Sequence, residues 1–178
     1  MEKTITSKEI YKGRVVKLDY DEVELDDGTR SIREVIKHNG GAAIALKTKD
    51  GRYMMVKQYR YAQKSDLLEV CAGKLNYLED PDEAIKREVE EELGYTLTNL
   101  KSLGYIIPTC GYSSEKIYLY YGEAKDYVGT HFDKDERIES YTFSLSEIEA
   151  MIKSGEITDA KTICIFYRLK LEGLLDAR

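Results

Sequence analysis

The sequence predicts an α+β fold, in which a few helices pack against β-sheet. Strand-like segments dominate, because several runs either alternate in polarity or are wholly apolar and are separated by turn residues. Helical patterns are fewer and do not alternate regularly with the strands, so a repeated parallel crossover arrangement is not indicated. The length of 178 residues suits one domain with a proper core and is short for two.

The first predicted element is a pair of strands between Glu9 and His38, where the pattern alternates on both sides of Asp26-Asp27-Gly28. A turn of that composition joins two strands into a hairpin. A second hairpin follows, formed by the apolar run Gly41–Leu46 and by Arg52–Tyr59, with its turn at Asp50-Gly51. A loop around Lys64–Asp66 then leads into the first helix.

That helix has clear signals at both ends. Asp80 offers a side-chain acceptor as N-cap, and Pro81 occupies the first helical position. Gly94 is placed to end the helix in the left-handed conformation. Between the two ends, an apolar stripe faces the core. Its members are Ala84, Ile85, Val89 and Leu93.

The remainder of the chain predicts more strands and then two helices. The strands are Leu97–Ile107, Lys116–Glu123 and Glu139–Phe143. A short helix over Ser144–Ser154 begins with a serine cap, and a longer helix covers Asp159–Leu175. Strands with helices packed on them give the α+β class, and periodicity alone goes no further.

The first helix also carries a cluster of acidic residues. Glu88, Glu91 and Glu92 are spaced i, i+3 and i+4, so they share one face of the helix and repel one another. Carboxylate oxygens are ligands that suit Mg²⁺ or Mn²⁺, and a bound cation would relieve this repulsion. Arg87 is placed to pair with Glu91 one turn on or with Glu79 in the preceding loop.

The spacing of these residues resembles the Nudix hydrolase signature, G-x5-E-x7-R-E-U-x-E-E-x-G-U, in which U is a bulky aliphatic residue. The last position departs from it, with Tyr95 in place of an aliphatic side chain. The matching residues are Gly73, Glu79, Arg87, Glu88, Val89, Glu91, Glu92 and Gly94. The resemblance implies an α/β/α sandwich around a mixed sheet for residues 41–178. It also makes residues 1–40 an N-terminal β element, which some relatives use for dimerisation.

Segments beyond the signature resemble the ADP-ribose pyrophosphatase branch of the family. One departure is Cys110, which stands where this branch usually carries a marker proline, and it lowers the specificity of the substrate assignment. Hydrolysis of GDP-mannose or of another nucleoside diphosphate sugar is therefore an alternative. Binding of ADP-ribose without hydrolysis, as a sensor, is another. The matching segments are residues 33–43, 56–61, 68–75, 107–120, 133–140 and 155–162.

The resemblance assigns the metal and the catalytic roles to named residues. Glu88 and Glu92 are implied as direct ligands of Mg²⁺ or Mn²⁺, together with the carbonyl oxygen of Ala72. Glu91 is implied as a further ligand or a neighbour of the ligands, and Arg87 as its partner. A glutamate in a late loop is implied as the general base that takes a proton from water, and Glu136 occupies that place.

Candidate substrate contacts follow from the chemistry of the side chains. Arg60 is expected to hold phosphate oxygens, because a guanidinium offers a bidentate fork. Arg33 is a second phosphate candidate, acting across a dimer interface. Glu69 and Glu115 are expected near the ribose or the metal. A tyrosine, Tyr112 or Tyr59, is expected to stack on the base.

The composition excludes several classes of function. A net charge of -6 argues against a nucleic-acid-binding surface. No apolar run approaches the ~20 residues of a membrane span, and the first residues lack the apolar stretch of a signal peptide. The three cysteines are odd in number and have no zinc-like spacing, which is typical of reduced thiols in the cytoplasm. We therefore expect a cytoplasmic protein, and the resemblance adds the expectation of a homodimer that acts on a small nucleotide sugar.

Overall fold

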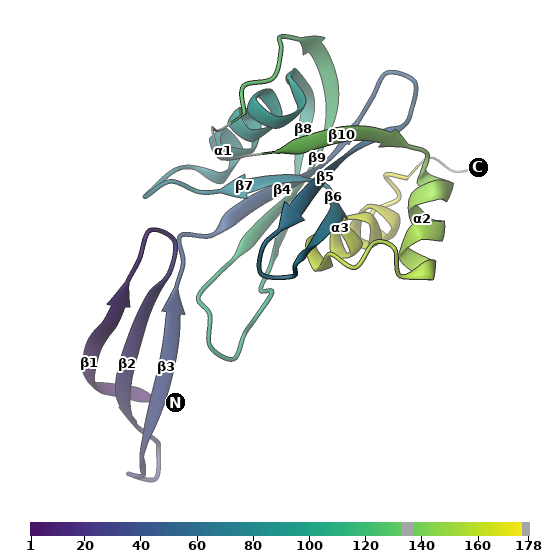
Figure 1. Cartoon of the computed structure of the whole chain (residues 1–178). Helices are drawn as coiled ribbons and strands as arrows, with labels where there is room; N and C mark the ends of the chain where they lie inside the picture. Colours follow the sequence, from purple (N-terminus) through teal and green to yellow (C-terminus); the bar gives the residue numbers. More distant parts are fainter. Residues whose placement is uncertain (133–136, 176–178) are drawn as a thin grey trace.

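The computed structural model describes residues 1–132 and 137–175, and in these residues the strands form two sheets (Figure 1). The small sheet contains β1 (Lys3–Lys12), β2 (Lys17–Glu24) and β3 (Arg30–Lys37), in that order, and projects from the rest of the molecule. The main sheet has the order β10-β5-β4-β9-β8, with β6 paired to β5 and β7 to β4. Its strands are β4 (Gly41–Lys47), β5 (Tyr53–Arg60), β6 (Ser65–Glu69), β7 (Cys71–Lys74), β8 (Tyr95–Ile106), β9 (Ile117–Tyr127) and β10 (Ile138–Phe143).

Helices cover both faces of the main sheet (Figure 1). One face carries α1 (Pro81–Glu88) and the π-helical turn η1 (Val89–Leu93) that continues it. The other face carries α2 (Leu145–Ser154) and α3 (Ala160–Leu171). Strands β4 and β9 are parallel, whereas β8–β9, β5–β10 and β4–β7 are antiparallel, so the sheet is mixed. The predicted α/β/α sandwich around a mixed sheet is confirmed.

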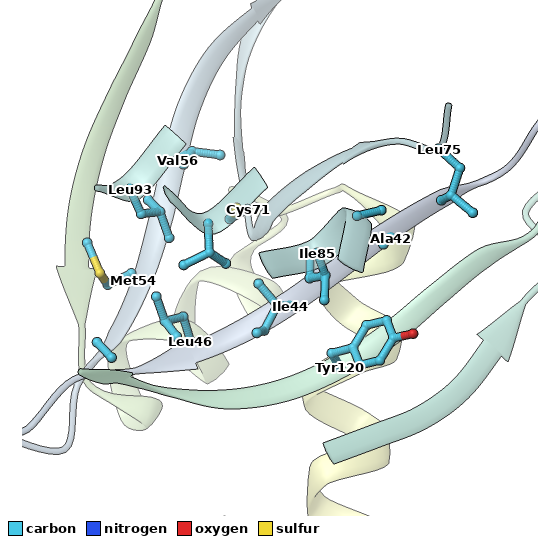
Figure 2. Close-up of a cluster of buried hydrophobic side chains, with 13 residues drawn as sticks. Ala42, Ile44, Leu46, Met54, Val56, Cys71, Leu75, Ile85, Leu93 and Tyr120 are labelled. Atoms are coloured by element: carbon cyan, nitrogen blue, oxygen red, sulfur yellow. The ribbon is translucent and has the colours of Figure 1, made fainter. Parts of the chain in front are cut away.

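The central strand β4 explains why both faces are covered. Its side chains alternate between the faces, and all of its residues from Gly41 to Leu46 are buried. Ala42, Ile44 and Leu46 pack in the core under α1 and η1, where Figure 2 shows them beside Ile85 and Leu93. Ala43 and Ala45 belong to the opposite core, under α2 and α3. A strand buried on both faces reads as a continuous apolar run, as the segment GAAIAL does.

The N-terminal element has one strand more than the sequence predicted. The predicted turn is present between β2 and β3, where the N–H of Gly28 donates to the carbonyl of Leu25. Strand β1 was missed because its few apolar residues do not alternate regularly with polar ones, and all of its residues are exposed. Strands β6 and β7 were also missed: part of the predicted loop around Lys64–Asp66 is in fact the start of β6.

The predicted starts of the helices are confirmed by their hydrogen bonds, whereas the last helix ends at Leu171 and not at Leu175 as predicted. The side chain of Asp80 accepts from the N–H of Asp82, Ser144 begins α2 with a capping box, and Asp159 caps α3. Gly94 has φ 72°, the left-handed conformation expected of it. The prediction of one regular α-helix from Pro81 is wrong in its last turn, because the chain widens to the π form at Val89. No described helix is long and apolar enough to cross a membrane.

Candidate active site

A cavity of about 900 Å³ lies where the small sheet meets the main domain. The connection between β1 and β2 is at the end of the small sheet nearer the main body (Figure 1). Arg14 in this connection and Lys17 at the start of β2 line the cavity. The segment that leads from β3 into β4 contributes His38. Strand β7 contributes Ala72 and Gly73. Helices of both layers, strands β4, β5 and β9 and the loops beside them supply the remaining wall. The cavity is thus built from segments far apart in the sequence.

The three clustered glutamates form one wall of this cavity. Glu88 is the last residue of α1, and Glu91 and Glu92 lie in the π-helical turn. Glu92 is buried at 4% exposure, the side chain of Glu88 is 12% exposed, and that of Glu91 is 42% exposed. Single π-helical turns within α-helices are frequent at functional sites. We call these three residues the carboxylate wall.

Arg87 ties the carboxylate wall to the preceding loop. Its guanidinium donates to Oε1 of Glu88 at 2.8 Å and to Oε2 of Glu91 at 2.9 Å. It also donates to both carboxylate oxygens of Glu79, at 3.0 and 3.2 Å, so both pairings proposed from the sequence occur together. Burial acts to lower the pKa of Arg87, but its hydrogen bond with Glu79 and the charge of Glu88 raise that pKa above its usual value. The cation is therefore a permanent part of the site.

Gly73 makes room for the carboxylate of Glu88. A Cβ atom placed on Gly73 would lie 1.8 Å from Cδ of Glu88, so only glycine permits the observed position. The result is a pocket for a carboxylate beside the backbone of β7, next to Ala72. Carboxylate and carbonyl oxygens are the donor set of a hard divalent cation. The residues present therefore fit Mg²⁺ or Mn²⁺.

The described residues do not contain a complete metal site made of side chains alone. Nowhere in residues 1–132 and 137–175 are three His, Cys, Asp or Glu side chains grouped as such a site. In this structure Arg87 forms ion pairs with Glu88 and Glu91, and these pairs compensate part of the negative charge of the two carboxylates. Mg²⁺ commonly keeps several waters and uses one or two carboxylates plus substrate phosphates, so a closed cage of protein ligands is not required.

Basic side chains outnumber acidic ones around the cavity, although the whole chain has a net charge of -6. Among the described residues that line it, seven are lysine or arginine and four are glutamate. They include Arg14 and Lys17 on the small sheet, Arg60 at the end of β5 and Lys161 on α3. Low-dielectric walls concentrate the field of such a cluster. The cavity is therefore suited to an anionic ligand.

Some of the predicted substrate contacts line the cavity and others do not. Arg60 and Glu115 line it, as Ala72 does. Arg33, Glu69 and Tyr112 do not belong to its wall in the described parts of the chain. The predicted general base, Glu136, lies outside the described residues. These roles therefore stay predictions.

The residues that do not reach the cavity have other neighbours. Arg33 lies on β3 and donates through Nε and Nη2 to the carboxylate of Glu2 in the same chain, at 3.0 and 2.6 Å. Tyr112 is exposed in the loop before β9, and its carbonyl accepts from the N–H of Ile36. Glu69 is buried at 1% exposure and binds Arg60. Any contact of Arg33 with substrate would therefore require it to leave Glu2.

The structure adds cavity residues that the sequence reasoning missed. Lys161 lies near the N-terminus of α3, in the segment 155–162 that resembles the family but was given no role. The resemblance of that segment to the family is the feature of the sequence that could have identified Lys161. Arg14 and Lys17 carried no signal, since only the folding of the small sheet brings them to the cavity. His38 also lines the cavity, and its Nδ1 accepts from the N–H of Gly40 at 3.0 Å.

Comparisons with known proteins show which family this chain resembles. The NUDIX domain model matches residues 37–164, and a model described as the nucleoside diphosphate sugar hydrolase N-terminal domain matches residues 2–36. A solved structure titled "Crystal structure of ADP compounds hydrolase" superposes with a TM-score of 0.84 at 17% identity, covering 97% of this chain and 95% of that one. At that identity the superposition supports the fold alone.

Curated relatives match over most of their lengths. A methanol dehydrogenase activator of Bacillus methanolicus is 37% identical, over 98% of this chain and 95% of its own. An ADP-ribose pyrophosphatase of Bacillus subtilis (strain 168) is 34% identical, over 99% and 97%. A GDP-mannose pyrophosphatase of Escherichia coli (strain K12) is 30% identical, over 84% and 87%. The signature residues, the sandwich fold and these matches together establish that this chain belongs to the Nudix family.

Proposed function

We propose that this protein hydrolyses the pyrophosphate bond of a nucleoside diphosphate sugar, and that its substrate is ADP-ribose, which would give AMP and ribose 5-phosphate. The observation that carries the proposal is the cavity itself. It sets a carboxylate wall suited to a divalent cation among an excess of basic side chains suited to phosphates. The ADP-ribose pyrophosphatase of Bacillus subtilis, similar along the whole chain, supports the choice of substrate.

The proposed metal is Mg²⁺, with Mn²⁺ as a substitute. Glu88 and Glu92 would hold it, with Glu91 and the carbonyl of Ala72 beside them. A divalent cation held there would neutralise charge on the diphosphate and lower the pKa of the attacking water. Gly73 contributes by leaving space for the carboxylate of Glu88.

The chain's own residues are proposed to divide the remaining work. Arg60 and the other cavity cations hold the phosphate oxygens, so the diphosphate is fixed with one phosphorus facing the attacking water. Arg87 holds Glu91 and Glu88 in place through its hydrogen bonds. Glu136 is proposed from the sequence as the base that removes a proton from water. The new P–O bond then forms as the bond to the bridging oxygen breaks.

A substrate panel tests this proposal. We expect the wild-type protein with Mg²⁺ to release AMP from ADP-ribose, and to do so with a higher kcat/KM than it shows for GDP-mannose. The ratio of kcat/KM values is the measurement, because discrimination is differential binding of transition states. Faster release of GMP from GDP-mannose would move the assignment to that sugar nucleotide. Tight binding of ADP-ribose without AMP release, with Mg²⁺ or Mn²⁺, would identify a sensor instead.

The small sheet supports a further proposal, that the protein is a homodimer joined through residues 1–40. Its first strand, β1, is exposed along its whole length, and an open strand edge is a template for pairing. Large apolar side chains also lie exposed on this sheet. They are Ile5, Ile10, Tyr11, Tyr20 and Ile32. A two-fold axis through this surface would bury them against their copies.

We expect Ile10→Glu to convert the dimer to a monomer, because it introduces a charge on this apolar surface. Light scattering at micromolar concentration measures the mass. The matched control is Ile107→Glu on the main domain, since Ile107 is 52% exposed and Ile10 is 51% exposed. A monomeric wild-type protein, or equal masses for both variants, would contradict the proposed interface.

The proposed role of Arg33 is tested by mixing Arg33→Ala subunits with Glu92→Gln subunits. Recovered activity in the mixture would mean that Arg33 acts in the partner's site.

A further inference from the structure

Two polar side chains meet at the edge of the main sheet where two connections enter it. His38 lies between β3 and β4, and Glu115 lies just before β9. Strands β4 and β9 are parallel neighbours that begin together, with Gly41 opposite Ile117. This register brings the two side chains to one place, where Oε1 of Glu115 lies 3.5 Å from Nδ1 of His38. Both residues line the cavity.

Hydrogen bonds between the two connections hold this pair in place. The N–H of His38 donates to the hydroxyl of Ser114 at 3.0 Å, and the N–H of Ser114 donates to the carbonyl of Ile36 at 2.9 Å. The N–H of Gly41 donates to the carbonyl of Lys116 at 2.9 Å. Side chains carried by such a frame are preorganised, which lowers the entropy cost of binding a ligand.

The imidazole of His38 keeps a hydrogen-bond donor for a ligand. Its Nδ1 accepts from the N–H of Gly40 at 3.0 Å. A neutral imidazole has one accepting and one donating nitrogen, so the ring proton lies on Nε2. Within residues 1–132 and 137–175 no acceptor takes this proton. The side chain is 14% exposed and belongs to the cavity wall, so Nε2–H is available to a ligand there.

The carboxylate of Glu115 keeps acceptors for a ligand. No group in the described part of the chain donates a hydrogen bond to this carboxylate. Nδ1 of His38 lies near it but already accepts from Gly40, so the ring offers it no proton. The side chain of Glu115 is 30% exposed at the cavity. A hydroxyl group suits this place, because it can donate to one neighbour and accept from another.

We infer that His38 and Glu115 bind the two neighbouring hydroxyl groups of a ribose in the substrate. One hydroxyl donates to the carboxylate of Glu115, and its neighbour accepts from Nε2 of His38. A phosphate oxygen accepts from His38 equally well, but it has no proton for Glu115. Only a ligand with donors and acceptors side by side matches both residues, and a ribose diol is such a ligand.

The distance from the carboxylate wall also fits a ribose. Ala42 pairs with Gly73, the residue that adjoins the carboxylate of Glu88. His38 precedes Ala42 by four residues, which span at most roughly 14 Å of extended chain. In a nucleoside diphosphate sugar a ribose is bonded directly to a phosphate, so it lies next to the diphosphate. The inference rests on the proposed function, because it names how that site recognises its sugar.

Calorimetric binding in the presence of Mg²⁺ tests the pair with ligands that differ by one hydroxyl. AMP is compared with its 2′-deoxy and 3′-deoxy forms, and ribose 5-phosphate with its 2-deoxy form. The two series test the two riboses of the substrate separately. We expect the wild-type protein to bind the complete ligand of at least one series about tenfold more tightly than its deoxy forms, since a hydrogen bond to a charged group is lost.

Three variants assign this preference to the pair. Glu115→Ala and His38→Phe should each weaken binding of the complete ligand and leave binding of the deoxy ligands unchanged, whereas a purely structural loss would weaken all of them. His38→Gln keeps an N–H donor and should retain part of the preference. His131→Phe is the matched control, because His131 is the other histidine of the chain and does not line the cavity.

The outcomes separate this inference from the proposed function. Equal affinity of the wild-type protein for complete and deoxy ligands in both series would overturn the inference alone. A preference of wild-type size in folded Glu115→Ala would do the same, and this variant removes no printed backbone hydrogen bond, so it decides even where His38→Phe unfolds. Failure of the wild-type protein to bind either AMP or ribose 5-phosphate would overturn both.

Discussion

Glu92→Gln is expected to reduce the turnover of ADP-ribose by two orders of magnitude or more and to leave the protein folded. Glu92 is the most buried residue of the carboxylate wall, so its carboxylate is the least screened by water. Loss of a metal ligand removes several kcal/mol of charge stabilisation, and each 1.4 kcal/mol is about tenfold in rate. Glutamine keeps nearly the same shape. Steady-state AMP release at saturating Mg²⁺ is the measurement.

The matched control for this variant is Glu90→Gln. Glu90 lies in the same π-helical turn but is exposed and does not line the cavity. Its substitution should leave turnover unchanged. The melting temperature of Glu92→Gln without metal should equal or slightly exceed that of the wild-type protein, because one of three repelling charges is gone. Near-normal turnover of folded Glu92→Gln would rule out the proposed metal site.

Gly73→Ala is expected to abolish most of the activity through a single added methyl group. Its Cβ would overlap the carboxyl group of Glu88, and the end of that flexible side chain would have to move away. The strand itself should persist, since Gly73 does not have a positive φ and pairs with Ala42 in β4. Turnover should therefore fall with the metal site, by a factor of roughly a hundred on the scale of Glu92→Gln. Circular dichroism should remain that of the wild-type protein.

The control here is Gly111→Ala, another glycine without a positive φ. A Cβ atom on Gly111 would meet nothing within 4 Å, so this variant should behave as the wild-type protein. If folded Gly73→Ala retained full turnover at limiting Mg²⁺, the observed position of Glu88 beside Gly73 would not be the active one. The pair of variants thus tests the geometry of Glu88 without changing its chemistry.

The fold was predictable wherever local signals and burial agree. Asp80, Pro81 and Gly94 bracket the first helix, and GAAIAL reads as a doubly buried strand because that is what β4 is. Strand β1 was not predictable, since its pairing with β2 buries none of its side chains. The π-helical turn at Val89 also left no local mark. The turn forms in the packed structure, where tertiary contacts override the intrinsic helix propensity of the residues.

The site was predictable to the extent that it lies in one stretch of sequence. The carboxylate wall and Arg87 come from a single helix, so their spacing indicated a shared face. The basic side of the cavity comes from the small sheet, β5 and α3, and no sequence spacing links Arg14, Arg60 and Lys161. The negative net charge of the whole chain would instead disfavour binding of an anionic ligand. Tertiary structure resolves this conflict by gathering a minority of the charges around one cavity.

Binding of a divalent cation by the carboxylate wall is the basis of the proposed catalysis. The most direct test is titration of Mn²⁺ followed by electron paramagnetic resonance, with α,β-methylene-ADP present because substrate phosphates commonly complete such sites. We predict saturable Mn²⁺ binding by the wild-type protein, weakened tenfold or more in Glu92→Gln and unchanged in Glu90→Gln. Mn²⁺ that binds equally well to all three proteins, or to none of them, would contradict the account.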